Sequence, residues 1–585
     1  MLVGILPVLS VLWSTLSVPP VLAGYNLENS YIELPDTGGY ITHSAAQSQA
    51  VEDRSLHRGW PVDLSSPGAG FPYTPTLFDI DGDGADEIFL TGGETFGLSG
   101  DGSFLPGWPT SEMLYMGYGT NDQMPGPSCG DMEGNGSVEI LWSLRDWYAG
   151  SAHYWTFNGR NSDGTDFAGL PMTAPDEPSN ALDYAFVLGD SDGDGKLEAW
   201  TAHTLGNTGT YYRISGMDNL GNLSFTADLD TAETVQNLFF GDADGNGSDE
   251  FFAVTLLDGE FRLHLFTSAG TEQPGYPVGL FAPGGGYLMF GPVMAADLDG
   301  DGDLEFIMGH YQSSISYASA YHHDGTVVAG FPITVATTSQ LFYLGLGDVT
   351  ADGYPELIVT DNHLGSGFRI YAIDIPTGSP LSGWPVALTN WPEGSPTVVD
   401  VNSDGTQDIC FTTNGGELFA LSNDGTVING YPKMMSASSI SGVAAGDIDG
   451  DGYYELVAAT HNGFVYAWDT DGVITSNNAD WPMCGIDPRN TNVYYSSPTG
   501  GIEDGPQPLS LTISSNPVKG SAVFEVTGST NSTVAIYDIT GKLISEISSR
   551  NNQISWTPGS NVTSGVYFAK LSGEPLNPLK FIVIR

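Results

Sequence analysis

Short apolar runs separated by Gly-, Asp- and Pro-rich turns dominate the chain. The runs IFL at 88–90, ILW at 140–142, FIM at 306–308, LIV at 357–359 and LVA at 456–458 each follow a glutamate directly. Runs of this length, rich in Ile, Leu, Val and Phe and bounded by turn residues, are typical of β-strands and not of amphipathic helices. The pattern therefore predicts an all-β chain.

One stretch shows the repeating unit most clearly. SPTVVDV at 395–401 is followed by an acidic loop, by DICFTTN at 408–414, by GGELFALS at 415–422 and by NDGTVINGYP at 423–432. This order predicts a strand, a loop, two strands joined by a tight turn, and a final short strand after an Asn-Asp-Gly turn. Such a four-stranded sheet cannot bury both faces alone, so several units must pack against one another.

The acidic loop recurs eight times. Its starts lie at residues 79, 131, 190, 242, 297, 348, 400 and 447, with spacings of 52, 59, 52, 55, 51, 52 and 47 residues. A period near fifty residues accommodates one four-stranded blade. We therefore expect an eight-bladed β-propeller over residues 57–495, with a seven-bladed ring and one irregular unit as the alternative.

A second marker accompanies the loops. GWP, GLP, GYP or GFP stands at 59, 107, 169, 275, 330, 383 and 430, and DWP stands at 480. Glycine turns the chain, the large side chain can pack between neighbouring sheets, and proline suits an edge or a turn. The marker is missing between the loops at 190 and 242, where LSFTADLD stands instead.

Charge limits the partners of the protein. The chain has 16 Lys and Arg against 70 Asp and Glu, a formal net charge of −54. Phosphate binding requires clustered basic residues, so nucleic acid is not an expected partner. A divalent cation suits this imbalance. Cys129, Cys410 and Cys484 have no metal-like spacing. We expect them to be buried thiols, and one disulfide is the less favoured alternative.

Each loop has oxygen-bearing side chains at positions 1, 3, 5 and 9 and glycine at position 6. Alternate side chains of a tightly curled loop can converge on a calcium ion, with position 7 offering its carbonyl. The predicted ligands are Asp79, Asp81, Asp83, Glu87, Asp131, Glu133, Asn135, Glu139, Asp190, Asp192, Asp194, Glu198, Asp242, Asp244, Asn246, Glu250, Asp297, Asp299, Asp301, Glu305, Asp348, Thr350, Asp352, Glu356, Asp400, Asn402, Asp404, Asp408, Asp447, Asp449, Asp451 and Glu455.

Acidic turns without an ion are the alternative, because Asp, Asn and Gly favour turns for local reasons. Turn formation does not require the acid found at position 9 of all eight loops. Oxygen ligands without His or Cys favour calcium over zinc or copper, and magnesium prefers fewer protein ligands. Up to eight Ca²⁺ ions would change the net charge from −54 to −38. The loops at 348 and 400, with Thr350 and Asn402 at position 3, are expected to bind most weakly.

With their flanking strands, as in TPTLFDIDGDGADEIFL at 74–90, these loops resemble FG-GAP/VCBS repeats. These repeats form the calcium-bearing blades of integrin α-subunit propellers and of many bacterial secreted proteins. The resemblance covers about three quarters of the chain and implies a calcium-stabilised propeller. For function it implies adhesion or ligand recognition, although some members carry enzymes.

The two ends of the chain differ from the array. Residues 1–23 have the pattern of a secretory signal, 24–56 form a lead-in, and 496–508 form a Gly-, Pro- and acid-rich linker. Residues 509–585 contain seven alternating strand patterns, which predict a small immunoglobulin-like β-sandwich.

This last segment resembles the C-terminal sorting domain of type IX secretion cargo. The resemblance rests on Asn516-Pro517, IYDITGKLI at 536–544, SGVYFAKL at 564–571 and KFIVIR at 580–585. It implies a type IX-like secretion apparatus as partner and a secreted or cell-surface location. After the first residues no apolar stretch is long enough to cross a bilayer.

No catalytic motif is present, and His153, His310, His322 and His323 belong to no known pattern. We therefore expect a calcium-binding propeller for recognition or adhesion, with an extracellular protein or glycan as ligand. A polysaccharide lyase or glycosidase on the same propeller is the alternative, and a structural surface component is a second. Residues 57–495 contain only nine Lys and Arg, which weighs against a lyase acting on uronates. Trp142, Trp147, Tyr148 and Trp155 would suit a sugar platform, although packing between blades is the preferred interpretation.

Overall fold

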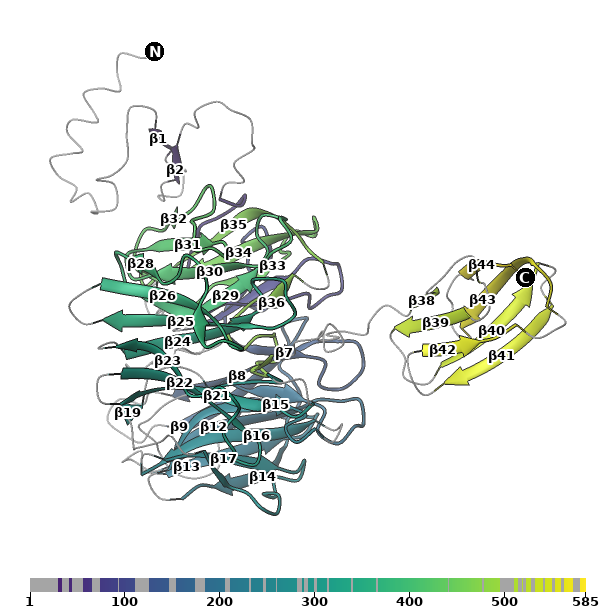
Figure 1. Cartoon of the computed structure of the whole chain (residues 1–585), viewed down its shortest axis with the longest axis horizontal. Helices are drawn as coiled ribbons and strands as arrows, with labels where there is room; N and C mark the ends of the chain where they lie inside the picture. Colours follow the sequence, from purple (N-terminus) through teal and green to yellow (C-terminus); the bar gives the residue numbers. More distant parts are fainter. Residues whose placement is uncertain are drawn as a thin grey trace, which may run out of the picture. The chain divides into compact units, whose positions relative to one another are not determined.

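The fold is given by a computed structural model of the whole chain (Figure 1). It divides into two compact units, Met1–Gly501 and Ile502–Arg585, which are considered separately. The residues described are 30–33, 41–44, 56–65, 74–92, 94–110, 126–146, 154–173, 185–205, 211–230, 233–245, 249–258, 260–280, 287–288, 293–298, 302–312, 315–337, 340–363, 367–439, 441–475, 478–494, 510–513, 518, 522–527, 532–539, 542–549, 553–558, 562–571 and 579–584. The predicted signal and linker lie outside them.

The described part of the first unit contains eight sheets, antiparallel except for one parallel pairing in the fifth, and a separate hairpin, β1 (Ser30–Glu33) with β2 (Ile41–Ser44). The first four sheets are β4 (Thr76–Phe78), β5 (Glu87–Thr91), β6 (Thr95–Leu98); β7 (Ser128–Gly130), β8 (Glu139–Asp146), β9 (Tyr154–Asn161), β10 (Met172–Thr173); β11 (Val187–Gly189), β12 (Glu198–Leu205), β13 (Tyr211–Met217), β14 (Leu223–Asp228); and β15 (Thr234–Gly241), β16 (Glu250–Leu257), β17 (Glu260–Phe266), β18 (Val278–Leu280).

The next four sheets follow the same order. They are β19 (Tyr287–Leu288), β20 (Met294–Ala296), β21 (Glu305–Gln312), β22 (Ile315–His322), β23 (Ile333–Thr337); β24 (Gln340–Gly347), β25 (Glu356–His363), β26 (Gly367–Asp374), β27 (Ser379–Pro380), β28 (Val386–Leu388); β29 (Pro392–Val399), β30 (Asp408–Thr413), β31 (Glu417–Leu421), β32 (Lys433–Met434); and β33 (Ala444–Gly446), β34 (Tyr453–Ala459), β35 (Phe464–Val473).

These elements match the expected unit closely. In the seventh sheet the first three strands lie where predicted, but the fourth, β32, begins at Lys433, just after the stretch expected to hold it. In the third sheet β14 takes the place of the missing marker, within LSFTADLD. The short first strands β4, β7, β11, β20 and β33 are buried at every position, because neighbouring sheets cover both of their faces.

The first strands of the sheets follow one another in a closed circle. β4 contacts β7, β7 contacts β11, and β11 contacts β15. β15 in turn contacts β37 (Val493–Tyr494), which pairs in parallel with β20. The circle continues from β21 to β24, β29 and β33, and β33 returns to β4. This radial arrangement of sheets around an axis is propeller-like.

The residues just before the first sheet complete the last sheet. β3 (Val62–Asp63) pairs with β35, some four hundred residues later in the chain. The backbone N–H of His57 also donates to Ala467 O at 2.8 Å, and Nδ1 of His57 lies 2.6 Å from Asp469 Oδ1. Hydrogen bonds between the two ends of the repeat array thus close the circle.

A segment that follows the last sheet runs along the innermost strands. We call residues 478–494 the central segment. It contains β36 (Ala479–Trp481), which pairs with β29, and β37. Its carbonyl groups accept hydrogen bonds of 2.8–3.4 Å from the backbone N–H groups of Ala445, Cys129, Leu188, Phe240 and Ala295. These donors belong to β33, β7, β11, β15 and β20, so with β29 the segment binds six of the eight sheets and satisfies inner edges that would otherwise lack partners.

The Gly-aromatic-Pro markers pack between sheets, as expected. Trp60, beside the last sheet, donates from Nε1 to Gly100 O of the first, and Trp384 donates to Asn423 O of the following sheet. Gly383 has φ +94°, and a Cβ placed there would lie 1.9 Å from Asp424 O, so only glycine allows this approach. The X-Pro bonds of the first seven markers are cis.

The second unit consists of two sheets around one core. Its seven strands are β38 (Ser510–Ile513), β39 (Ala522–Thr527), β40 (Ser532–Asp538), β41 (Leu543–Ser549), β42 (Gln553–Trp556), β43 (Gly565–Leu571) and β44 (Leu579–Val583). The order is β38-β39-β42 in one sheet and β41-β40-β43-β44 in the other. Phe524, Ile536, Trp556 and Ala569 meet between them. Seven strands is the number that the alternation in residues 509–585 predicted.

Candidate metal centres

The acidic loops connect the first and second strands of their sheets and are curled by the aspartate at position 1. In the first loop Asp79 Oδ1 accepts the N–H of Gly82 at 2.7 Å, and Oδ2 accepts that of Gly84 at 2.9 Å. The loops starting at Asp190 and Asp447 have matching contacts at position 6. These bonds turn the position-1 carboxylate towards the inside of the loop, where the side chains of positions 3 and 5 also begin.

The acid at position 9 closes each loop from the adjoining strand. Glu87 is 6% exposed and accepts the N–H of Ile80, at position 2, at 2.9 Å. The position-9 acids Glu139, Glu198, Glu250, Glu305, Glu356, Asp408 and Glu455 make the same contact with their own loops. Position 9 therefore has a structural role in the loop besides any role in binding an ion.

Burial and neighbouring carboxylates make this position electrostatically unfavourable. Burial, together with the charges of Asp81, Asp79 and Asp83, raises the pKa of Glu87 to about 7. The same causes raise the pKa of Glu455 to about 9. Because a nearby positive charge stabilises a buried carboxylate, a cation within the loop would relieve this cost.

The donor sets fit a cation. Among the described residues, carboxylate oxygens lie within 4.8 Å of one another in at least three loops: Asp79, Asp81 and Glu87; Asp190, Asp192 and Asp194; Asp242, Asp244 and Glu250.

A further sign comes from the loop at 400. Asp408 Oδ2 accepts the N–H of Val401, whereas its buried Oδ1 has no hydrogen-bond partner among the described residues. Burial and the charges of Asp404 and Asp400 raise the pKa of Asp408 to about 8. A hard cation is one kind of partner that would stabilise such an oxygen. Of the predicted ligands, Asn246, Asp299 and Asp301 lie outside the described residues.

Two loops are strained at position 4. Glycine occupies this position with positive φ in the loops at 79, 131, 190, 242 and 447. Ala351 and Ser403 have φ +57° at the same place. A left-handed conformation costs a residue with a Cβ roughly 1 kcal/mol. The loops at 348 and 400 therefore have a less favourable backbone as well as the ligand sets with Thr350 and Asn402 at position 3.

Neighbouring loops are also linked to one another. Asp86 N–H donates to Asp447 O at 2.6 Å, and Asp447 N–H donates to Asp86 Oδ2 at 2.9 Å, which joins the first and last loops. Between the loops at 348 and 400 lies a cleft of about 400 Å³, lined in part by Asp348, Asp400 and Asn478.

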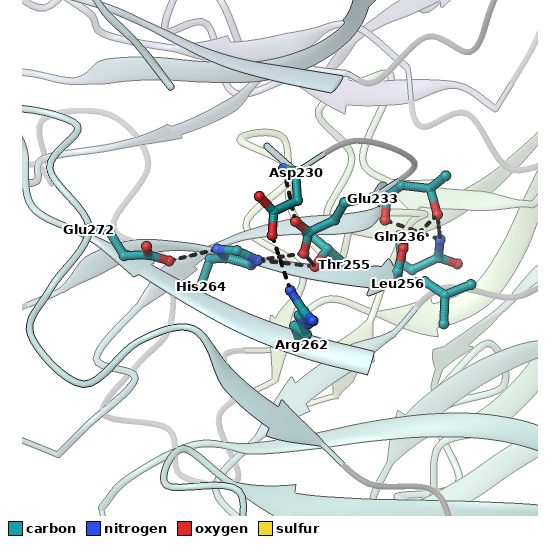
Figure 2. Close-up of polar contacts among 9 residues, drawn as sticks. Asp230, Glu233, Gln236, Thr255, Leu256, Arg262, His264 and Glu272 are labelled. Carbon is teal, nitrogen blue, oxygen red and sulfur yellow. Dashed lines mark hydrogen bonds and ion pairs between the residues drawn. The ribbon is translucent and has the colours of Figure 1, made fainter. Parts of the chain in front are cut away.

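A buried polar cluster in the fourth sheet had no signal in the sequence (Figure 2). His264 Nδ1 lies 2.7 Å from Glu272 Oε1, and His264 Nε2 lies 2.9 Å from Glu233 Oε1. The Thr255 hydroxyl donates to the same oxygen of Glu233 at 2.5 Å. His264, Glu233 and Thr255 are at most 5% exposed. The residues come from separate strands and turns, so no local motif could indicate the cluster.

The pKa values of this cluster move apart. Burial alone would lower the pKa of His264, but its hydrogen bonds to Glu233 and Glu272 outweigh burial and raise it. Burial would raise the pKa of Glu233, but the hydrogen bonds from His264 and Thr255 lower it to about 2. The imidazole ring of His264 therefore bridges two carboxylates.

Other candidates from the sequence resolve as packing. Trp142 is 3% exposed and its ring lies 5.5 Å from that of Trp108, so it is not part of an exposed sugar platform. Trp147, Tyr148 and the side chain of Trp155 lie outside the description, as does His153. Cys129, Cys410 and Cys484 form no disulfide with one another, as expected, and the first two are buried.

Comparison with known families agrees with both units. The model of an FG-GAP-like repeat matches residues 400–458, and that of a secretion system C-terminal sorting domain matches residues 513–585. The chain thus combines an FG-GAP-like, propeller-like repeat unit with a type IX sorting domain. It is a protein exported by the type IX system, either into the medium or onto the outer cell surface. No curated protein matches it.

Several solved structures resemble the chain at low identity. BBS1N in complex with ARL6DN is 10% identical, with a TM-score of 0.38 over 59% of this chain and 92% of that one. The computationally designed Ika8 protein is 12% identical, with a TM-score of 0.35 over 70% and 98%. BamB from Moraxella catarrhalis is 14% identical, with a TM-score of 0.38 over 71% and 99%. Within the described part of the chain no helix has the length and apolarity to cross a membrane.

Proposed function

We propose that the first unit is an eight-bladed, calcium-stabilised β-propeller that recognises or adheres to an extracellular protein or glycan. The observation that supports this proposal is the repeated convergence of carboxylates, with an acid at position 9 that is buried in seven of the eight loops and half-buried, as Glu198, in the third. In the first loop Asp79, Asp81 and Glu87 already lie within 4.8 Å of one another. Asp83 and the carbonyl of Ala85 would complete the oxygen shell that Ca²⁺ prefers.

Calcium in this proposal serves rigidity. The loops join the inner strands to the second strands, and neighbouring loops are hydrogen-bonded to each other. Ions in the loops would neutralise the closely spaced carboxylates and hold the loop ends of the sheets in one arrangement. A rigid, largely acidic face of this kind is suited to selective contact with a partner. The cleft beside Asp348 and Asp400 is the first place to look for a bound ligand.

The first test counts calcium. The mature protein should retain several Ca²⁺ ions per chain after gel filtration, and chelation should lower its unfolding midpoint. A site held at one hundred times its dissociation constant contributes about 2.7 kcal/mol. The variant Asp81→Asn should lose one ion, whereas Glu94→Gln, in the adjoining hairpin, should lose none. An unchanged unfolding midpoint and no bound calcium would show that the loops are acidic turns without an ion.

The second test separates the functions. Immobilised protein, with calcium and with chelator, is exposed to a panel of extracellular glycans and matrix proteins. Calcium-dependent binding without product formation supports recognition. Release of reducing or unsaturated sugars with turnover would establish a carbohydrate-active enzyme instead. Self-assembly into ordered layers without any ligand would favour a structural surface component.

A further inference from the structure

The fifth repeat combines two adjacent histidines with an acid at position 7 of its loop, and the sequence has this combination in no other repeat. Asp303 is at position 7 of the loop that starts at Asp297, and His322 and His323 follow one another at the end of β22. In the other seven loops position 7 is not acidic: it is Ala85, Ser137, Lys196, Ser248, Tyr354, Thr406 and Tyr453. The β-ladder brings the group together, because His322 is the direct partner of Glu305 across β21 and β22.

The distances between these side chains suit metal ligands. His322 Nδ1 lies 2.8 Å from Glu305 Oε1 and 3.8 Å from Asp303 Oδ1. His323 Nε2 lies 3.1 Å from Asp303 Oδ2. Donors that share one tetrahedral zinc ion at ~2.0–2.1 Å lie roughly 3.3 Å apart, a value that these three distances bracket. Ligand atoms of Asp303, Glu305 and His322 lie within 4.8 Å of one another, and Oδ2 of Asp303 faces His323.

The orientation of His323 agrees with this role. Its other ring nitrogen, Nδ1, lies 3.2 Å from the hydroxyl of Tyr276, the aromatic residue of the preceding marker. Histidines that bind metals almost always use the second nitrogen in such a hydrogen bond, which fixes the ring. Glu305 serves both neighbours, because Oε2 accepts the N–H of Leu298 in the acidic loop while Oε1 faces His322.

We propose that His322, His323 and Asp303, with Glu305 as a shared ligand, form a transition-metal site that binds Zn²⁺ next to the fifth acidic loop. Imidazole nitrogens favour zinc over calcium, and two imidazoles with carboxylates are a common zinc donor set. Asp303, Glu305 and His322 are at most 21% exposed in their side chains, and His323 is 28% exposed. The site is therefore partly enclosed yet open to entry of an ion from solvent.

The test is titration of the calcium-saturated, full mature chain with Zn²⁺ by calorimetry, and with Co²⁺ by visible absorption. We expect one high-affinity equivalent and a Co²⁺ spectrum that contains nitrogen ligands. His322→Gln and His323→Gln should each weaken binding by at least ten-fold. His461→Gln, in a turn of the last sheet, is the matched control and should bind as the native chain does.

Asp303→Asn separates this site from the calcium loop. Position 7 offers calcium its backbone carbonyl, so this variant should lose zinc affinity and keep its calcium count. Unchanged zinc affinity in the two histidine variants, or no binding by the native chain, would overturn the proposal and leave the group as ion pairs. If the native protein bound no calcium, the proposed calcium sites of the propeller would be refuted, but the zinc measurement would still decide on the zinc site, because zinc binding is measured separately.

Discussion

Replacement of His264 offers a sharp test of the buried cluster in the fourth sheet. His264→Leu keeps a side chain of similar bulk but removes both ring nitrogens that face Glu233 and Glu272. Glu233 is 1% exposed and would remain as a buried carboxylate without its histidine partner. Removal of one member of a buried pair costs about 3–5 kcal/mol.

The pKa of Glu233 gives a second measure of the same quantity. It falls from 4.5 to about 2 in the folded protein. At 1.36 kcal/mol per pKa unit this corresponds to roughly 3 kcal/mol. Glu272→Gln is the matched control, because the Glu272 side chain is 35% exposed and retains an oxygen to accept the hydrogen bond. An exposed pair of this kind contributes about 0.2–1 kcal/mol.

The assay is denaturant unfolding of the calcium-saturated protein, followed by tryptophan fluorescence, from pH 4 to pH 8. Glu233 has a lowered pKa, so its stabilisation is present above pH 4.5 and is lost as pH falls towards 2. His264 has a raised pKa, so its contribution is complete below pH 6.5 and declines as pH rises through the folded value. The difference between native protein and His264→Leu should therefore be largest between pH 4.5 and 6.5. Equal costs for both variants, or a pH-independent difference, would refute this account.

Three further predictions concern other buried groups. The ring of His203 lies 5.7 Å from that of Phe157, and burial lowers the pKa of His203 to about 4, so the native protein loses stability as pH falls below 6.5. In thermal melts, His203→Phe should be more stable than the native chain at pH 5, and this advantage should be smaller at pH 7. Cys410 is fully buried and its pKa is raised, so a thiol reagent should label it only after unfolding. Asn490 donates to Ser128 Oγ at 2.7 Å from the central segment, and Asn490→Ala should cost about 1–3 kcal/mol in denaturant unfolding, a loss that an unchanged midpoint would contradict.

Much of the fold follows from local sequence. The loop at 79, the strand that begins at Glu87 and the marker at Trp108 depend on turn chemistry, on short apolar runs and on packing of a single aromatic residue. Each of these signals lies within about ten residues, and the acidic loop recurs eight times along the chain. For the same reason all seven strands of the second unit could be predicted from alternation.

The candidate metal loops were predictable to the same extent. Their ligand spacing is a property of consecutive residues, and the structure brings Asp79, Asp81 and Glu87 together as that spacing requires. The buried position of Glu87 and its bond to Ile80 were not predictable, because both depend on how β5 continues into the core.

Tertiary structure alone decided the features that join distant residues. Pairing of β3 with β35, the path of residues 478–494 across six sheets, and the clusters around His264 and His323 depend on contacts between separate repeats or strands. N–H groups at strand edges and charged groups buried away from water both need partners. The closed circle of sheets determines which groups lie close enough to serve as those partners. A linear pattern specifies which residues need such partners, but only the folded chain determines which ones they meet.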